Sequence, residues 1–224
     1  MGGIFGNVAK TDCVTDLFYG TDYLSHLGTR KGGMAVLDAD NFSRAIHNLE
    51  NSYFRTKFES DLDELQGSKG IGVISDTESQ PIIVSSHLGT FGIVTVSKIN
   101  NIDELSKIAF DKKKHFSETG GGGINPTELV AMLISEKNSF EEGIEYAQEC
   151  INGSCSMLLL TLSTLAILLA TRLSRMDWAL MPDAAVSKIL NIDMIYCPLI
   201  ASFSFWMLPL RKRRLAWYSN ALAA

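Results

Sequence analysis

The sequence predicts an α+β protein in which an antiparallel sheet packs against helices. Apolar, strand-like runs gather in the first part of the chain, and two or three helical segments then follow one another. Strands and helices do not alternate as they do in a βαβ chain. A four-layer αββα sandwich, with two sheets between two layers of helices, is one architecture with this order.

The N-terminal part predicts strands and one helix. Asp12 or Thr15 is expected to cap a helix that runs toward His26. Gly32 and Gly33 are interpreted as a turn before the next strand. Short apolar runs beside glycines predict strands at residues 3–8, 34–37 and 70–74.

A hairpin is the clearest local signal in the chain. The segment His87-Leu88-Gly89-Thr90 has turn chemistry, and it joins two β-rich runs at residues 81–86 and 91–96. Residues 42–58, before this hairpin, mix polar and apolar side chains, and we expect loops there. A helical turn is expected at residues 61–65.

The remaining elements are helices followed by a strand. Asn125 is expected to be the N-cap of one helix, with Pro126 in its first turn, and Ser139 caps another. The spacing predicts helices at residues 102–110, 127–135 and 140–150, and a buried strand at 156–161.

The composition is that of an acidic globular protein. Of the 224 residues 46% are hydrophobic and 20% are charged, and the formal net charge is −5, so we expect no nucleic-acid partner. The four cysteines form no CxxC pair and the four histidines form no HExxH motif, so we expect no metal. No cofactor motif occurs, and the Gly120–Gly123 run is interpreted as a loop. The cysteine content and the lack of a signal-peptide pattern favour a cytoplasmic location.

The composition changes abruptly near Thr161. All 18 glycines lie between Gly2 and Gly153, whereas residues 162–224 contain neither Gly nor Glu and hold all three tryptophans. Residues 1–161 carry 13 Lys and Arg against 22 Asp and Glu, and residues 162–224 carry 7 against 3. We therefore predict a domain at residues 1–161 and an atypical tail at residues 162–224.

Three interpretations of this tail are open: a small separate domain, a membrane segment, or a stretch translated out of frame. The abrupt change in composition favours the last. The apolar runs at residues 157–170 and 196–210 are shorter than the roughly 20 residues that span a bilayer. Their length argues against a membrane segment.

Six short motifs occur in a characteristic order along residues 1–161. They are Gly3-Ile4-Phe5-Gly6, residues 19–29 with 33–36, Gly70-Ile71-Gly72, residues 94–101, Thr127-Glu128 and residues 153–161. Together they resemble the N-terminal class II glutamine amidotransferase domain of amidophosphoribosyltransferase. The resemblance implies a four-layer αββα fold of the N-terminal-nucleophile hydrolases, incomplete in this chain, and a role in purine biosynthesis.

In that family an N-terminal Cys attacks the amide of glutamine, an Asn and a Gly form the oxyanion hole, and an Arg and an Asp bind the α-carboxylate and α-amine. The matching positions here are all substituted: Gly2 for the Cys, Ser75 for the Arg, Val96 and Ser97 for the Asn and Gly, and Pro126 for the Asp. Gly2 has no side chain to attack with, and Ser75 lacks the guanidinium fork that suits a carboxylate. The resemblance therefore implies a degenerate glutaminase site.

We accordingly expect an amidophosphoribosyltransferase-like protein, reduced to its glutamine amidotransferase domain and inactive alone. A pyrophosphate-binding loop of the Asp-Asp-Ser type does not occur in the sequence. Two alternatives are open: a non-catalytic binding or regulatory scaffold with the same fold, and a membrane-tethered protein that uses the apolar tail. Glutamine is the ligand that the resemblance implies, but the substitutions argue against its binding, and a homo-oligomer is left open.

Overall fold

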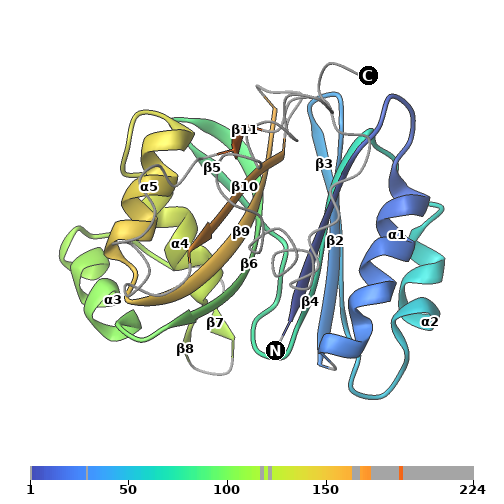
Figure 1. Cartoon of the computed structure of the whole chain (residues 1–224), viewed down its shortest axis with the longest axis horizontal. Helices are drawn as coiled ribbons and strands as arrows, with labels where there is room; N and C mark the ends of the chain where they lie inside the picture. Colours follow the sequence, from blue (N-terminus) through green and yellow to red (C-terminus); the bar gives the residue numbers. More distant parts are fainter. Residues whose placement is uncertain are drawn as a thin grey trace, which may run out of the picture.

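A computed structural model of the chain describes residues 2–28, 30–116, 119–120, 123–162, 167–172 and 187–188. These residues form two large antiparallel sheets, a two-stranded sheet and five α-helices. Helices flank the pair of large sheets on both sides (Figure 1). The predicted combination of antiparallel sheets with separate helices is confirmed.

The first sheet has the strand order β1-β4-β2-β3, and all its pairs are antiparallel. Its strands are β1 (Gly3–Val8), β2 (Lys31–Asp38), β3 (Asn41–Asn48) and β4 (Lys69–Ser75). One face is covered by α1 (Val14–Tyr23) and α2 (Phe54–Phe58), which lead into the 3-10 helices η1 (Leu24–Leu27) and η2 (Glu59–Asp61). Buried side chains fill the space between this face and the helices, among them Phe5, Met34, Ile74, Leu17 and Phe58.

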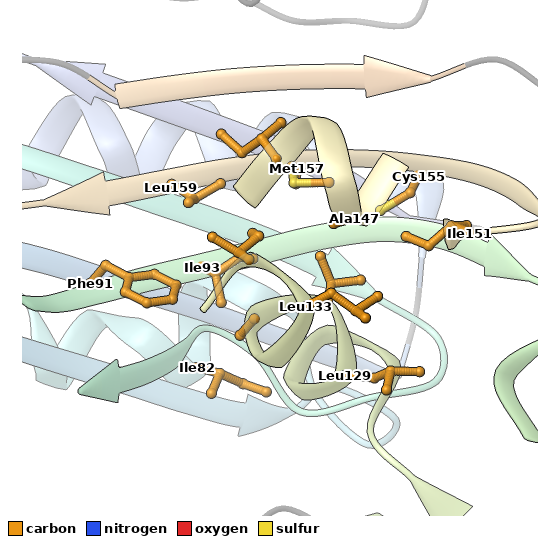
Figure 2. Packing of buried hydrophobic residues seen from close by; sticks show 14 of the residues in the cluster. Ile82, Phe91, Ile93, Leu129, Leu133, Ala147, Ile151, Cys155, Met157 and Leu159 are labelled. Carbon is orange, nitrogen blue, oxygen red and sulfur yellow. The ribbon is translucent and has the colours of Figure 1, made fainter. Parts of the chain in front are cut away.

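The second sheet has the order β11-β10-β9-β6-β5 and is also antiparallel. Its strands are β5 (Ile82–Ser86), β6 (Gly89–Ile99), β9 (Gly153–Thr161), β10 (Ile167–Arg172) and β11 (Ser187–Lys188). The helices beside it are α3 (Ile102–Asp111), α4 (Pro126–Ile134) and α5 (Phe140–Cys150), with a small hairpin of β7 (Thr119–Gly120) and β8 (Gly123–Ile124). Figure 2 shows side chains of β6 and β9 packed against α4 and α5. The strands contribute Phe91, Ile93, Met157 and Leu159, and the helices contribute Leu129, Leu133 and Ala147.

A third apolar cluster lies between the two sheets. It joins residues of β1, β2 and β4 to residues of β6 and β9: Ile4, Ala35, Leu37, Ile71, Val73, Val94, Leu158 and Leu160. Because successive side chains of a strand point to opposite faces, β6 and β9 supply alternate residues to this cluster and to the one under the helices. Both strands are therefore buried on both faces, which explains their continuous apolar runs.

Two local predictions are wrong. Residues 42–58 were expected to form loops, but they contain β3 and α2. No residue of the edge strand β3 is fully buried, so its sequence does not show the alternation of a half-buried strand. The helix α2 has five residues, too few to show a helical period of apolar residues. Gly32 and Gly33 were expected to form a turn, but both lie inside β2.

The caps of α4 and α5 follow the predictions, whereas that of α1 does not. The side chain of Asn125 accepts a hydrogen bond from the Thr127 backbone N–H, and that of Ser139 accepts one from the Glu142 N–H. Asp12 accepts a hydrogen bond from the Val14 N–H, although the N-cap position of α1 is Cys13. These local signals were readable because a cap needs only a short polar side chain beside free backbone N–H groups.

The described part of the tail extends the second sheet. The apolar run at residues 157–170 contributes to β9 and β10, which pair with Ile167 opposite Leu160. Among the described residues no helix is both long and apolar enough to cross a membrane. The run at residues 196–210 lies outside the described residues, and the out-of-frame interpretation and the boundary at Thr161 stay predictions.

Candidate functional site

Gly2 is buried where β1 begins, beside the carboxyl end of β4. A Cβ atom on Gly2 would lie 2.5 Å from the carbonyl oxygen of Ile74 and 3.5 Å from Cγ2 of Val96. Real Cβ atoms essentially never come within 3.0 Å of another heavy atom, and the blocking oxygen belongs to the backbone. A side chain at the position that the resemblance assigns to the nucleophile therefore requires the backbone at residue 2 or at Ile74 to shift.

The structure brings Gly2, Ser75 and Val96 to one place. Ser75 directly follows Ile74 at the end of β4, and Val96 packs against the cluster between the sheets. The Ser75 hydroxyl is used locally, because it accepts a hydrogen bond of 3.3 Å from the Thr77 backbone N–H. Neither side chain offers a charge that would bind an amino-acid carboxylate.

Ser97 and Pro126 lie on elements that are in contact with each other. Val96 faces the first sheet, so the pleat of β6 turns the side chain of Ser97 to the opposite face. The Ser97 Oγ atom is buried and has no hydrogen-bond partner within the described part of the chain. Pro126 is the first residue of α4, which is joined to β6 by a hydrogen bond of 2.6 Å between the hydroxyls of Thr95 and Thr127. That the five substituted positions form one degenerate site stays a prediction.

A buried polar network, which the sequence analysis missed, links the β4–β5 connection to β6. The carboxamide of Gln80 accepts a hydrogen bond of 2.6 Å from the Thr95 backbone N–H and donates one of 3.0 Å to the Thr95 carbonyl. The same carboxamide donates to Glu78 Oε1 at 3.1 Å, and the Thr77 hydroxyl donates to Glu78 Oε2. Gln80 is 1% exposed and Glu78 is 8% exposed.

Two further contacts hold this connection in place. Asn125, the cap of α4, donates to the Ser79 carbonyl at 3.2 Å, and Lys31 donates to the Ser79 hydroxyl at 3.2 Å. The hydroxyls of Thr95 and Thr127 share a hydrogen bond of 2.6 Å, which joins β6 to α4. The segment is thereby fixed to the first sheet, the second sheet and a helix.

Burial raises the pKa of the Glu78 carboxyl. A backbone hydrogen bond and the positive charge of Lys31 oppose this effect without cancelling it. The network therefore contains hydrogen-bond donors and acceptors and one buried acid. It contains no thiol, and each of its hydroxyls named above already has a partner.

This network is hard to predict from the sequence. Residues 76–80 are polar and lie between two apolar strands, a pattern typical of an exposed loop. One signal was present but misread: a Cβ atom on Gly33 would lie 1.8 Å from the Gln80 carbonyl oxygen. Because Gly33 has no side chain, the backbone of Gln80 can pass directly over β2 at this point.

Polar side chains outside this network have local partners. His87 contacts the Lys137 carbonyl at 2.8 Å, and the neighbouring Ser85 hydroxyl pairs with Thr90. His47 pairs with Asp61 at 2.6 Å. Over the described residues no group of three or more His, Cys, Asp or Glu side chains is placed to hold a metal ion.

Comparison with known proteins identifies the fold. No protein-family model matches the chain, and no curated protein sequence matches it. A solved structure described as glutamine phosphoribosylpyrophosphate (PRPP) amidotransferase from B. subtilis, complexed with ADP and GMP, matches with a TM-score of 0.65 and 18% sequence identity. A second, described as the allosteric regulatory enzyme of purine biosynthesis, matches with a TM-score of 0.65 and 17% identity.

Each match covers 76% of this chain but 37% of the solved chain. At this level of identity the comparison shows a related amidotransferase-like fold and not a shared activity.

Proposed function

We propose that this chain is an amidotransferase-like domain that keeps the fold of the N-terminal-nucleophile hydrolases without hydrolysing glutamine. Two antiparallel sheets share an apolar cluster, and each has a second cluster against helices. This arrangement supports the four-layer αββα sandwich expected from the sequence motifs.

The closure of the space around Gly2 carries the proposal. A missing nucleophile alone would be a chemical loss at an otherwise intact site. Here the Ile74 carbonyl oxygen would also lie only 2.5 Å from the Cβ of a nucleophilic residue, so the backbone would have to shift to accept that residue. An N-terminal nucleophile needs its side chain beside the α-amine, and this packing disfavours that geometry.

The substrate-binding side supports the same proposal. The side chains of Ser75 and Val96 carry no charge and no amide. Without the guanidinium that the family uses for the α-carboxylate, free glutamine loses the bidentate, charge-assisted hydrogen bonds that suit a carboxylate. We therefore propose a structural or regulatory role for this domain in an amidophosphoribosyltransferase-like protein of purine biosynthesis.

The test is a glutaminase assay with the full chain. Glutamate and ammonia formation from glutamine would be followed for the wild-type protein and for Gly2→Cys, each against a protein-free blank. We expect neither protein to exceed the blank. The wild type lacks a nucleophile, whose loss costs several orders of magnitude in rate, and Gly2→Cys restores a thiol but neither the groups that bind glutamine nor the space at residue 2. Turnover by the wild-type protein in proportion to its concentration would overturn the proposal.

A second assay separates a scaffold from a transferase. The full chain would be incubated with phosphoribosyl pyrophosphate and ammonia, and release of pyrophosphate would be measured. The proposed role predicts no release by this chain. Release that depends on both substrates would show a transferase activity and contradict a purely structural role.

A further inference from the structure

Gln80 continues the pairing of β5 with β6 through its side chain. In this ladder Ile82 lies opposite Ile93 and Ile83 opposite Gly92, so the same register places Gln80 opposite Thr95. The strand β5 begins only at Ile82, and the intervening Pro81 has no N–H to donate. The two hydrogen bonds that Thr95 makes here go to the carboxamide of Gln80 and not to its backbone.

A primary carboxamide can do this because it presents the same groups as a peptide bond. It has one carbonyl acceptor and an N–H donor beside it, and its second N–H is available for another acceptor. That second donor has a partner too, since Gln80 Nε2 lies 3.1 Å from Glu78 Oε1. The carboxamide is thus bound by a peptide N–H, a peptide carbonyl and a buried carboxyl oxygen.

We propose that the backbone N–H and carbonyl of Thr95, together with Glu78, form a binding subsite for primary carboxamides, with Gln80 as its intramolecular ligand. The ligand is tethered through the backbone beside Gly33 and by the contacts of Ser79 with Asn125 and Lys31. Tethering gives Gln80 a high effective concentration, so a free amide does not displace it. The chain closes this subsite to outside ligands.

The subsite is defined by the contacts of this chain alone and does not rest on the proposed function. Truncation of Gln80 to alanine removes one methylene group and the carboxamide, which together match acetamide in size and shape. The variant leaves the Thr95 N–H and carbonyl buried without partners, at a cost of about 1–3 kcal/mol for each unsatisfied group. Acetamide should enter this space and restore the hydrogen bonds.

The experiment measures the thermal midpoint of the full chain with and without acetamide. Gln80→Ala should have a lower midpoint than the wild type, and acetamide should raise it in a saturable manner. Acetamide should not raise the midpoint of the wild type, of Gln80→Met, which refills the space without polar groups, or of Gln66→Ala, which removes an exposed carboxamide. Acetate, which has no N–H, should fail with Gln80→Ala.

An equal response of Gln80→Ala and Gln80→Met to acetamide would overturn the proposal. If Gln80→Ala does not fold, the wild-type protein still provides a test. The side-chain amide protons of Gln80 should then exchange with solvent at least about tenfold more slowly than those of Gln66, and equal rates would show that the carboxamide is not held. A failed acetamide test leaves the glutaminase result unaffected, so the two proposals can fail separately.

Discussion

The packing around residue 2 predicts that even the smallest side chain destabilises the protein. In Gly2→Ala the new Cβ would lie 2.5 Å from the Ile74 oxygen, whereas ordinary contacts begin at 3.4 Å. The Cβ and the oxygen would have to move apart by roughly 0.5–0.9 Å, through a shift of the backbone at residue 2 or at Ile74. Overpacking of this kind costs about 1–3 kcal/mol.

Gly92→Ala is the matched control. Gly92 also lies in a strand, but its nearest neighbours would be 3.5 Å from the new Cβ, an ordinary contact distance. Replacing glycine by alanine at a compatible site stabilises a protein by about 0.4–1 kcal/mol, because it lowers the conformational entropy of the unfolded chain. Urea unfolding should therefore give a lower free energy of unfolding for Gly2→Ala and an equal or higher one for Gly92→Ala. Equal values for the two variants would refute the argument that the position is closed.

Three further predictions concern other buried groups. Gly20→Ala should lower the free energy of unfolding by about 1–3 kcal/mol, because its Cβ would lie 2.3 Å from the Phe5 ring; urea unfolding that matches the wild type would contradict this. Burial raises the pKa of Glu78 above its usual 4.5, so its contribution to stability is present below pH 4.5 and is lost as the pH rises through the folded-state pKa. Glu78→Gln should gain stability relative to the wild type between pH 4.5 and pH 7 in unfolding curves, and a constant difference would count against it. Burial raises the pKa of the Cys13 and Cys155 thiols to about 12, so mass spectrometry should find both unalkylated by iodoacetamide in the folded protein at mildly alkaline pH and modified after unfolding.

The elements that could be predicted from the sequence are those with strong local signals. The hairpin of β5 and β6 has turn residues between two apolar runs, and α4 and α5 carry side-chain caps at Asn125 and Ser139. The strand β3 was missed because it lies at the edge of the described sheet, where its side chains are partly exposed. The sequence does not show which strand lies at an edge. The helix α2 was missed because its five residues are too few to show a helical pattern.

The candidate site could be predicted only in part. The motifs led to Gly2 and Val96, which do lie together, but they did not show that Ser97 faces the other way. Burial of Glu78 and Gln80 arises from the crossing of β2 at Gly33, a contact between segments far apart in the sequence. Local patterns cannot report such a contact, so the polar network had to be found in the structure.

The proposed function requires that no glutamine binds beside residue 2. The most direct test is a crystal structure of the full chain grown with glutamine in large excess. We predict that no glutamine lies between the start of β1 and β6. A glutamine molecule in contact with residue 2 would contradict the proposal.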